Sequence, residues 1–153
     1  MSMEKVIKGE NPGKLIENII ENDFDLMVDK IKNELGYTVR QTVLTQLKDF
    51  KEFKGILETY IKYCKVFNYK VSFIIFNKKK EYRNSQLDII LENIRQDYNL
   101  TKEKFSKMKL NLSSYNYTYI TFKRNTCQFQ KINDIFKDKL GFNIIYVLTK
   151  VEV

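Results

Sequence analysis

The sequence predicts a mainly α-helical protein with some α+β character, built from two helical units that each end in a β-strand. Apolar residues recur at steps of three and four over most of the 153 residues, which is typical of amphipathic helices. Two segments, Tyr69–Phe76 and Phe142–Leu148, are instead rich in β-branched and aromatic residues, as strands are. We expect these two strands to pair with each other, because an isolated strand leaves its backbone amides without partners.

The first unit is expected to cover residues 14–80, after a polar leader over residues 1–13. Leu15–Leu35 carries apolar residues at helical spacing throughout and predicts one long amphipathic helix. Gly36 follows directly and can adopt the left-handed conformation that commonly ends a helix.

Two further helices are expected before the strand of the first unit. Thr38 and Gln41 are three positions apart and predict a capping box, in which two side chains satisfy backbone amides at the start of a helix. Gly55 indicates a break in this helix, and a third helix is predicted from Ile56 to Phe67.

The second unit is expected to cover residues 81–153 and has its own start and stop signals. Ser85 and Asp88 predict a capping box, which opens a helix that Asn99 can end in the left-handed conformation. Thr101 is the predicted cap of the next helix. A last helix precedes the terminal strand, since apolar residues recur at helical spacing up to a glycine at position 141.

The segment Ser113–Arg124 fits two different structures. Its tyrosines alternate with other residues, and the β propensity of the stretch favours a strand. Ser113 is nevertheless a suitable helix cap, and Tyr117 and Ile120 are three positions apart, as on one face of a helix. The residues alone leave both structures open.

The chain is basic, with a net charge of +8, and the charge is concentrated in two stretches. Lys62–Lys80 holds six lysines and no acidic residue, and Lys102–Lys131 holds seven basic residues against Glu103 alone. Such stretches suit partners rich in phosphate, although a lysine-rich composition also arises in AT-rich genomes.

Several kinds of chemistry have no support in the sequence. The chain contains no histidine, which is the commonest general base and the commonest metal ligand. Cys64 and Cys127 cannot form a zinc site by themselves, and we expect both to pack in the core. No glycine-rich phosphate loop is present. We therefore expect no enzymatic activity, no metal, no cofactor and no small-molecule substrate.

The start of the chain and its apolar segments indicate a cytoplasmic protein. Residues 1–13 are polar where a signal peptide would be apolar, and no apolar stretch approaches the ~18–20 residues that span a bilayer. We expect no membrane association and reduced thiols.

An internal repeat is indicated when Ile31 is placed over Ile94. The segment IKNELGYT then aligns with IRQDYNLT, and a threonine falls on a threonine. Both halves of the chain later continue with a helix followed by a strand. This pattern predicts a duplication, with chance similarity between two amphipathic segments as the alternative.

Residues 88–148 resemble the phage-repressor helix-turn-helix family, the group of Cro and the lambda repressor. The resemblance is carried by the segments IRQDYNLTKEKFSK, LNLSSYNYTYITFKR and NTCQFQKINDIFKDKLG. It implies a scaffold helix over Lys102–Met108 and a recognition helix over Ser114–Arg124, with Tyr117 and Ile120 as its buried anchors. The scaffold helix is one residue longer than is usual in the family, as measured from Phe105 to Leu110. The first half has no matching recognition segment, so the resemblance implies a degenerate, structural copy there.

The resemblance also implies which residues contact DNA. Base edges would be contacted by Ser114, Tyr115, Asn116, Thr118, Tyr119 and Thr121, among which Asn116 has the only amide. Phosphates would be contacted by Lys102, Lys104, Lys107, Lys109, Lys123 and Arg124.

Two functions from different classes follow. The favoured expectation is a sequence-specific DNA-binding regulator of a mobile element (a phage or plasmid) or of a low-GC bacterium, which binds double-stranded DNA as a homodimer. The alternative is a protein-binding inhibitor or adaptor of the anti-defence, anti-CRISPR or antitoxin type, which would use the same fold to contact a host protein or RNA.

Overall fold

The computed structural model describes residues 5–19, 24–36 and 40–151, and it is mainly helical with one antiparallel sheet. This confirms the predicted fold class at the level of mainly α with α+β character. In chain order the first half contains β1 (Val6–Gly9), α1 (Pro12–Ile19), α2 (Phe24–Leu35), α3 (Arg40–Lys51), α4 (Leu57–Val66) and β2 (Tyr69–Phe76). The second half contains β3 (Glu81–Asn84), α5 (Leu87–Asp97), α6 (Lys102–Met108), α7 (Tyr115–Lys123), α8 (Phe129–Ile132), its π-helical continuation η1 (Asn133–Lys139) and β4 (Asn143–Lys150).

The described strands form one sheet in the order β1-β4-β2-β3, and all neighbours are antiparallel. The predicted pairing of the two long strands is confirmed, since β2 pairs with β4 from Tyr69↔Lys150 to Phe76↔Asn143. Each short edge strand pairs with the long strand of the other half, β1 with β4 and β3 with β2. The two halves are therefore interlocked through the sheet.

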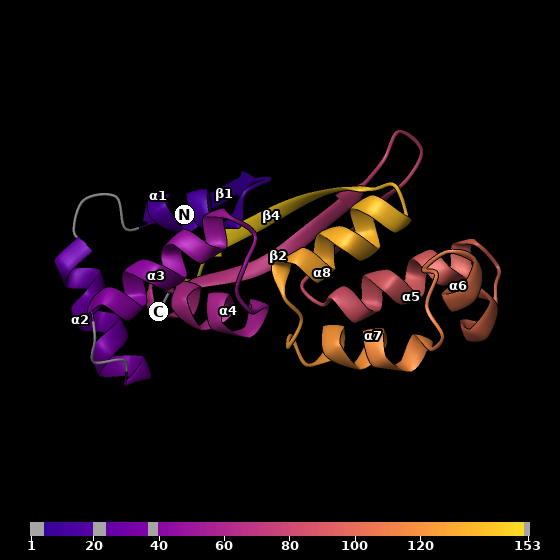
Figure 1. Cartoon of the computed structure of the whole chain (residues 1–153). Coiled ribbons are helices and arrows are strands. Elements are labelled where there is room, and N and C mark those ends of the chain that lie inside the picture. Colours follow the sequence, from indigo (N-terminus) through magenta and orange to yellow (C-terminus); the bar gives the residue numbers. More distant parts are fainter. Residues whose placement is uncertain (1–4, 20–23, 37–39, 152–153) are drawn as a thin grey trace.

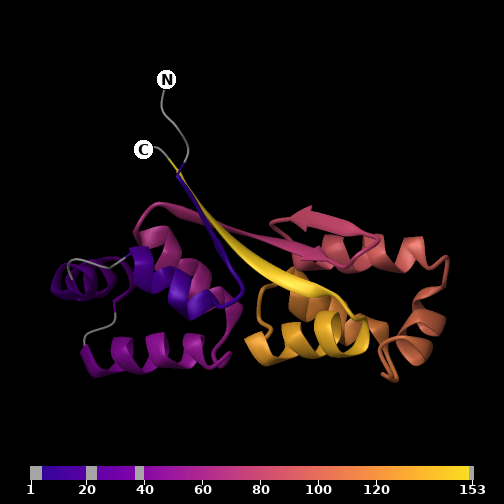
Figure 2. The same ribbon diagram turned by 90° about the horizontal axis from the view of Figure 1, so that it is seen from above.

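The two halves are arranged with an approximate two-fold symmetry. Both follow the same order, a short strand, helices and then a long strand. Ile56 and Gln128, which directly precede α4 and α8, form a β-bridge with each other. Around this bridge the Leu57 amide donates to the Cys127 carbonyl (3.0 Å), and the Phe129 amide donates to the Gly55 carbonyl (3.2 Å). Figures 1 and 2 show one group of helices from each half, with β2 and β4 running from one group to the other.

The core lies between the sheet and the two groups of helices. Alternate residues of β2 and β4 face the helices, where Phe73 and Tyr146 are paired in register and almost fully buried. Phe129 from the second half packs edge-on against Phe50 and Tyr60 from the first half, with ring centroids 5.8 and 5.3 Å apart. One continuous core therefore joins both halves.

The predicted leader over residues 1–13 is wrong where the structure describes it. Residues 6–9 form β1, and α1 already begins at Pro12. Because β1 is short and pairs with a strand some 140 positions away, it leaves little local signal in the sequence. The strand β3 was missed because it is equally short and carries Glu81 and Arg83, although it forms a hairpin with the neighbouring strand β2.

The single long helix predicted over Leu15–Leu35 is also wrong. The structure has two helices there, and they pack against different partners: α1 against β1 and α3, and α2 against α4. The apolar residues of both helices share a helical period, so their spacing shows no boundary. Thr38, which we expect to cap the next helix, lies outside the described residues.

Several helix boundaries agree with the sequence. Gly36, Gly141 and Asn99 have φ angles of 76°, 77° and 56° at the ends of α2, η1 and α5, so each adopts the predicted left-handed conformation. Thr101 is the N-cap of α6 and accepts a hydrogen bond from the Lys104 amide at 3.3 Å. The break near Gly55 is likewise present between α3 and α4.

The predicted capping box of Ser85 and Asp88 is wrong. The N-cap of α5 is Gln86, whose side chain makes no cap hydrogen bond. Asp88 is only 5% exposed and lies on the buried side of the helix.

The predicted repeat alignment is wrong as well. It places Ile31 over Ile94, but Ile31 lies in α2 and Ile94 lies in α5. The order of the elements instead makes α1 the counterpart of α5.

Both cysteines are buried in the core, as predicted, and neither forms a disulfide. Burial raises the pKa of the Cys127 thiol to about 12, and burial raises the pKa of the Cys64 thiol well above its usual range. Both thiols therefore stay neutral in the folded protein at mildly alkaline pH.

We expect the free energy of unfolding to fall as the pH rises above about 8.5, the ordinary pKa of a thiol. The unfolded chain then releases two protons that the folded protein retains, so each thiol lowers the stability by about 1.4 kcal/mol per pH unit. Urea titrations at about pH 8 and about pH 9.5 measure this fall. The variant with both Cys64→Ala and Cys127→Ala should show a flatter dependence, and an unchanged dependence would contradict the prediction.

Candidate nucleic-acid interface

The segment that fits two structures forms the helix α7. Ser114 is its N-cap, and its hydroxyl accepts a hydrogen bond from the Asn116 amide at 3.3 Å. Tyr115, Thr118 and Phe122 are the buried residues, at steps of three and four that place them on one face of a helix. The helical alternative is thereby confirmed, and the strand favoured by local propensity is wrong.

The predicted anchors of α7 are wrong by one or two positions. Tyr117 and Ile120 are 70% and 43% exposed, whereas Thr118 and Phe122 are fully buried. Six residues, 109–114, separate α6 from α7, and Asn111 turns with a φ of 51°. The turn is closed by the Ser106 hydroxyl, which donates to the Leu112 carbonyl at 3.1 Å. This turn is longer than the roughly three to four residues of a standard helix-turn-helix, which accounts for the rotated register of α7.

Two residues predicted to contact bases point into the protein instead. Tyr115 is 3% exposed, and its hydroxyl donates to the Glu92 carboxylate at 2.7 Å. Arg95 also binds this carboxylate and, through that hydrogen bond, lowers the pKa of Glu92, while burial raises the pKa of Tyr115. Thr118 is fully buried between α7 and the core. The predicted base contacts of Tyr115 and Thr118 are therefore wrong.

The other predicted base contacts differ in their exposure. Tyr119 is half-buried, with its ring stacked on Tyr115 at 5.8 Å between centroids. Thr121 is half-buried, and its hydroxyl donates to the Thr118 carbonyl at 2.9 Å. Ser114 is exposed but is used as the N-cap, and Asn116 is exposed.

We call the exposed side of α7 its outward face, and it consists of Asn116, Tyr117, Ile120 and Lys123. These residues follow helical spacing over two turns and include one amide, one aromatic ring, one branched aliphatic chain and one cation. The sequence interpretation missed Tyr117 and Ile120, because apolar residues at helical spacing are normally taken to be buried.

The basic residues predicted to contact phosphates lie on α6 and α7 and at the C-terminal ends of these helices. Lys104, Lys123 and Arg124 are exposed, and Lys107 forms an exposed ion pair with Glu103 at 3.1 Å. The Lys102 ammonium lies over the rings of Tyr115 and Tyr119, and the Lys109 ammonium lies 4.7 Å from the centre of the Tyr98 ring. Exposed ion pairs and cation–π contacts of this kind are weak, so these cations can still contact an anion.

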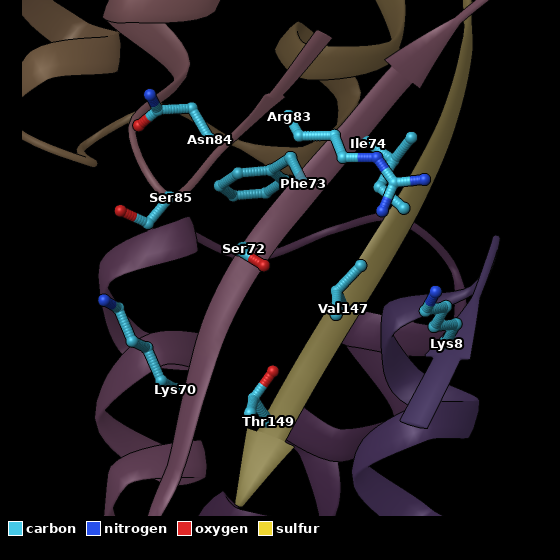
Figure 3. Close-up of a pocket in the computed structure, with 10 residues that line it drawn as sticks. All are labelled: Lys8, Lys70, Ser72, Phe73, Ile74, Arg83, Asn84, Ser85, Val147 and Thr149. Atoms are coloured by element: carbon cyan, nitrogen blue, oxygen red, sulfur yellow. The ribbon is translucent and has the colours of Figure 1, made fainter. Parts of the chain in front are cut away.

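A second basic surface, which we call the open sheet face, lies on the side of the sheet away from the helices. Lys8, Lys70 and Arg83 are among the residues that line a hollow of about 570 Å³ on this face. Figure 3 shows these side chains. The Arg83 side chain extends across Ile74, which is only 6% exposed although it does not belong to the main core. The sequence interpretation missed this surface, because two of its cations lie on the edge strands β1 and β3.

The described part of the chain contains neither a cluster of metal-binding residues nor a helix that could span a membrane. Within it, no three His, Cys, Asp or Glu residues come close enough together to hold a metal ion. No described helix has both the length and the apolar character needed to cross a bilayer. In comparisons with protein families, curated proteins and solved structures, the chain matches none.

Proposed function

We propose that the protein binds double-stranded DNA through α7 and acts as a sequence-specific regulator. The observation that carries the proposal is the outward face of α7, which presents an amide, a ring, an aliphatic group and a cation, with further exposed basic residues on α6 and at the end of α7. In this interpretation α6 is the scaffold helix of a helix-turn-helix unit and α7 is the recognition helix. The DNA would be that of a mobile element or of a low-GC bacterium, with the protein working in the cytoplasm.

The residues of the outward face have the chemistry for base contacts. Recognition helices place residues near their N-terminus at base edges in the major groove. The Asn116 amide can donate to and accept from adenine at once, and Ile120 can contact a thymine methyl group. Tyr117 adds a hydroxyl between them. Lys104, Lys123 and Arg124 would contact phosphates and supply affinity that does not depend on sequence.

The Asn116→Ala variant tests this assignment. We expect it to bind a preferred duplex, selected from random sequences with the native protein, about 10- to 100-fold more weakly, because a bidentate adenine contact supplies about 1–3 kcal/mol of discrimination. Titration by fluorescence anisotropy measures the change. Lys123→Ala should instead weaken binding to every duplex and lower the salt slope by about one unit.

The matched control is Lys70→Ala on the open sheet face, which removes the same charge at a site away from the helices and should leave binding unchanged. Selection of no preferred duplex, or full affinity of Asn116→Ala for it, would contradict the proposal. If Lys70→Ala alone lost binding, the DNA-binding site would lie on the open sheet face instead of on α7.

A second function is favoured by the exposed apolar residues near α7. Met108 is 67% exposed, and it lies at the end of α6 before the exposed Tyr117 and Ile120. Methionine and aromatic residues are enriched in the centres of protein interfaces. The same region would then bind a host protein, as an inhibitor or adaptor does. In that case Tyr117→Ala and Met108→Ala abolish recovery of the partner, whereas Lys123→Ala has little effect on it.

A further inference from the structure

We infer that α3 is a second DNA-contacting helix, so that a single chain carries two recognition helices for two half-sites of one duplex. The inference rests on the proposed function of α7 and extends it to the first half of the chain. It replaces the expected homodimer with one chain whose halves act as the two subunits.

The packing of the helices makes α3 the counterpart of α7. In the first half α1 packs against β1 and α3 packs against α1; in the second half α5 packs against β3 and α7 packs against α5. The two edge strands correspond as well, since each pairs with the long strand of the other half. The approximate two-fold symmetry that exchanges β1 with β3 therefore also exchanges α3 with α7.

The burial of individual residues supports the same correspondence. Val43 and Leu47 are the buried residues of α3 ahead of Phe50, and Thr118 and Phe122 are their counterparts in α7. Each residue of α7 lies 75 positions after its counterpart, since 118 − 43 and 122 − 47 both equal 75. The edge strands keep this spacing, because Lys8 and Arg83 are also 75 positions apart and face the same side of the sheet.

The exposed residues of α3 then match the outward face of α7. Gln41 corresponds to Asn116, Thr45 to Ile120, and Lys48 to Lys123, and all six are exposed. Thr42 is exposed in the place of Tyr117. The sequence alone implies that the first half lacks a recognition helix. The match between α3 and α7 instead assigns one to it.

The two helices lie away from the strands of the sheet. Figure 1 places α7 below the sheet in the right-hand group, and Figure 2 places α3 along the lower edge of the left-hand group, away from the strands. Because α1 and α5 lie between them and the edge strands, α3 and α7 form the outer layer of their groups.

The chemistry of the two faces predicts half-sites that are related but not identical. Gln and Asn both have a side-chain amide that can bind adenine in a bidentate manner, so Gln41 and Asn116 should favour the same base at equivalent positions. The remaining pairs differ, since a threonine in α3 replaces the aromatic ring of Tyr117. One chain would therefore bind its site in a single orientation. A homodimer on an exact palindrome has no such preference, because its two half-sites are identical.

The test uses the full chain and the duplex selected with it. We expect one protein per duplex by native mass spectrometry, and a footprint of two half-sites about 34–36 Å apart. Gln41→Ala should lose protection at one half-site and Asn116→Ala at the other, each with about a 10- to 100-fold loss of affinity. Lys70→Ala is the control and should protect both half-sites, and circular dichroism checks that each variant is folded.

The outcomes separate this inference from the proposed function. The inference would be overturned if two proteins bound each duplex and the Gln41→Ala variant still protected both half-sites in the footprint. The protein would then be a homodimer with α7 as its recognition helix. Full affinity and protection by Asn116→Ala would overturn the proposed function itself.

Discussion

Replacing Phe129 with alanine is expected to lower the free energy of unfolding by about 3–5 kcal/mol. The Phe129 side chain is fully buried, and its ring contacts Phe50 and Tyr60 of the first half as well as Tyr146 in β4 at 5.8 Å between centroids. The truncation leaves a cavity where the two halves meet the sheet, and three neighbouring rings would have to move together to fill it. A urea titration of the native protein and the variant measures the difference.

The control for this prediction is Tyr117→Ala, which truncates another aromatic ring on the surface. Tyr117 is 70% exposed, so we expect a change within about 0.5 kcal/mol. A loss below about 1 kcal/mol for Phe129→Ala would show that the rings of the two halves do not depend on one another.

The Gly13→Ala variant is expected to lose about 2 kcal/mol of stability, through overpacking between α1 and α3. A β-carbon at position 13 would lie 2.3 Å from the Lys51 backbone nitrogen and 2.6 Å from the Lys51 α-carbon. Backbone atoms cannot move aside as a flexible side chain does, so the two helices would have to separate. Helix propensity alone predicts the opposite sign, a gain of up to about 1 kcal/mol.

Thermal unfolding of Gly13→Ala and of the neighbouring Lys14→Ala separates the two effects. Lys14 is exposed on the same helix, and its replacement should leave the stability within about 0.5 kcal/mol. A Gly13→Ala protein that is more stable than the native one would contradict the close approach of α1 to α3.

Sequence patterns predict the elements whose signals are local. The two long strands, the left-handed ends at Gly36, Asn99 and Gly141, and the Thr101 cap all depend on residues within a few positions of one another. The pairing of the long strands also follows, because backbone amides need partners and few other strands are available. These elements account for most of the architecture.

The register of α7 shows where local signals mislead. Thr118 is less apolar than Tyr117 and Ile120, yet it is the buried residue, because the turn before α7 fixes the rotation of the helix. Hydrophobicity alone selects the wrong face in such a case. The extra residue between Phe105 and Leu110, relative to the helix-turn-helix pattern, is the signal in the sequence that could have revealed this shift.

The edge strands and the correspondence between α3 and α7 show the limits of the sequence in another way. Strands β1 and β3 are short and carry charges, as edge strands do, and the partner of β1 lies some 140 positions away in the chain. The spacing of 75 positions between α3 and α7 becomes visible only when burial is known for both helices. The identical residues in the two halves are too few to reveal it.

The crossing of the edge strands has a consequence for the evolution of this chain. The short strand of each half pairs with the long strand of the other half, and the two long strands pair with each other. Deleting either half would therefore leave the backbone amides and carbonyls of the remaining long strand without partners along its length. Such an edge invites aggregation, and selection would remove a shortened chain. The sheet therefore depends on both halves of the chain, while the surfaces of those halves remain able to diverge.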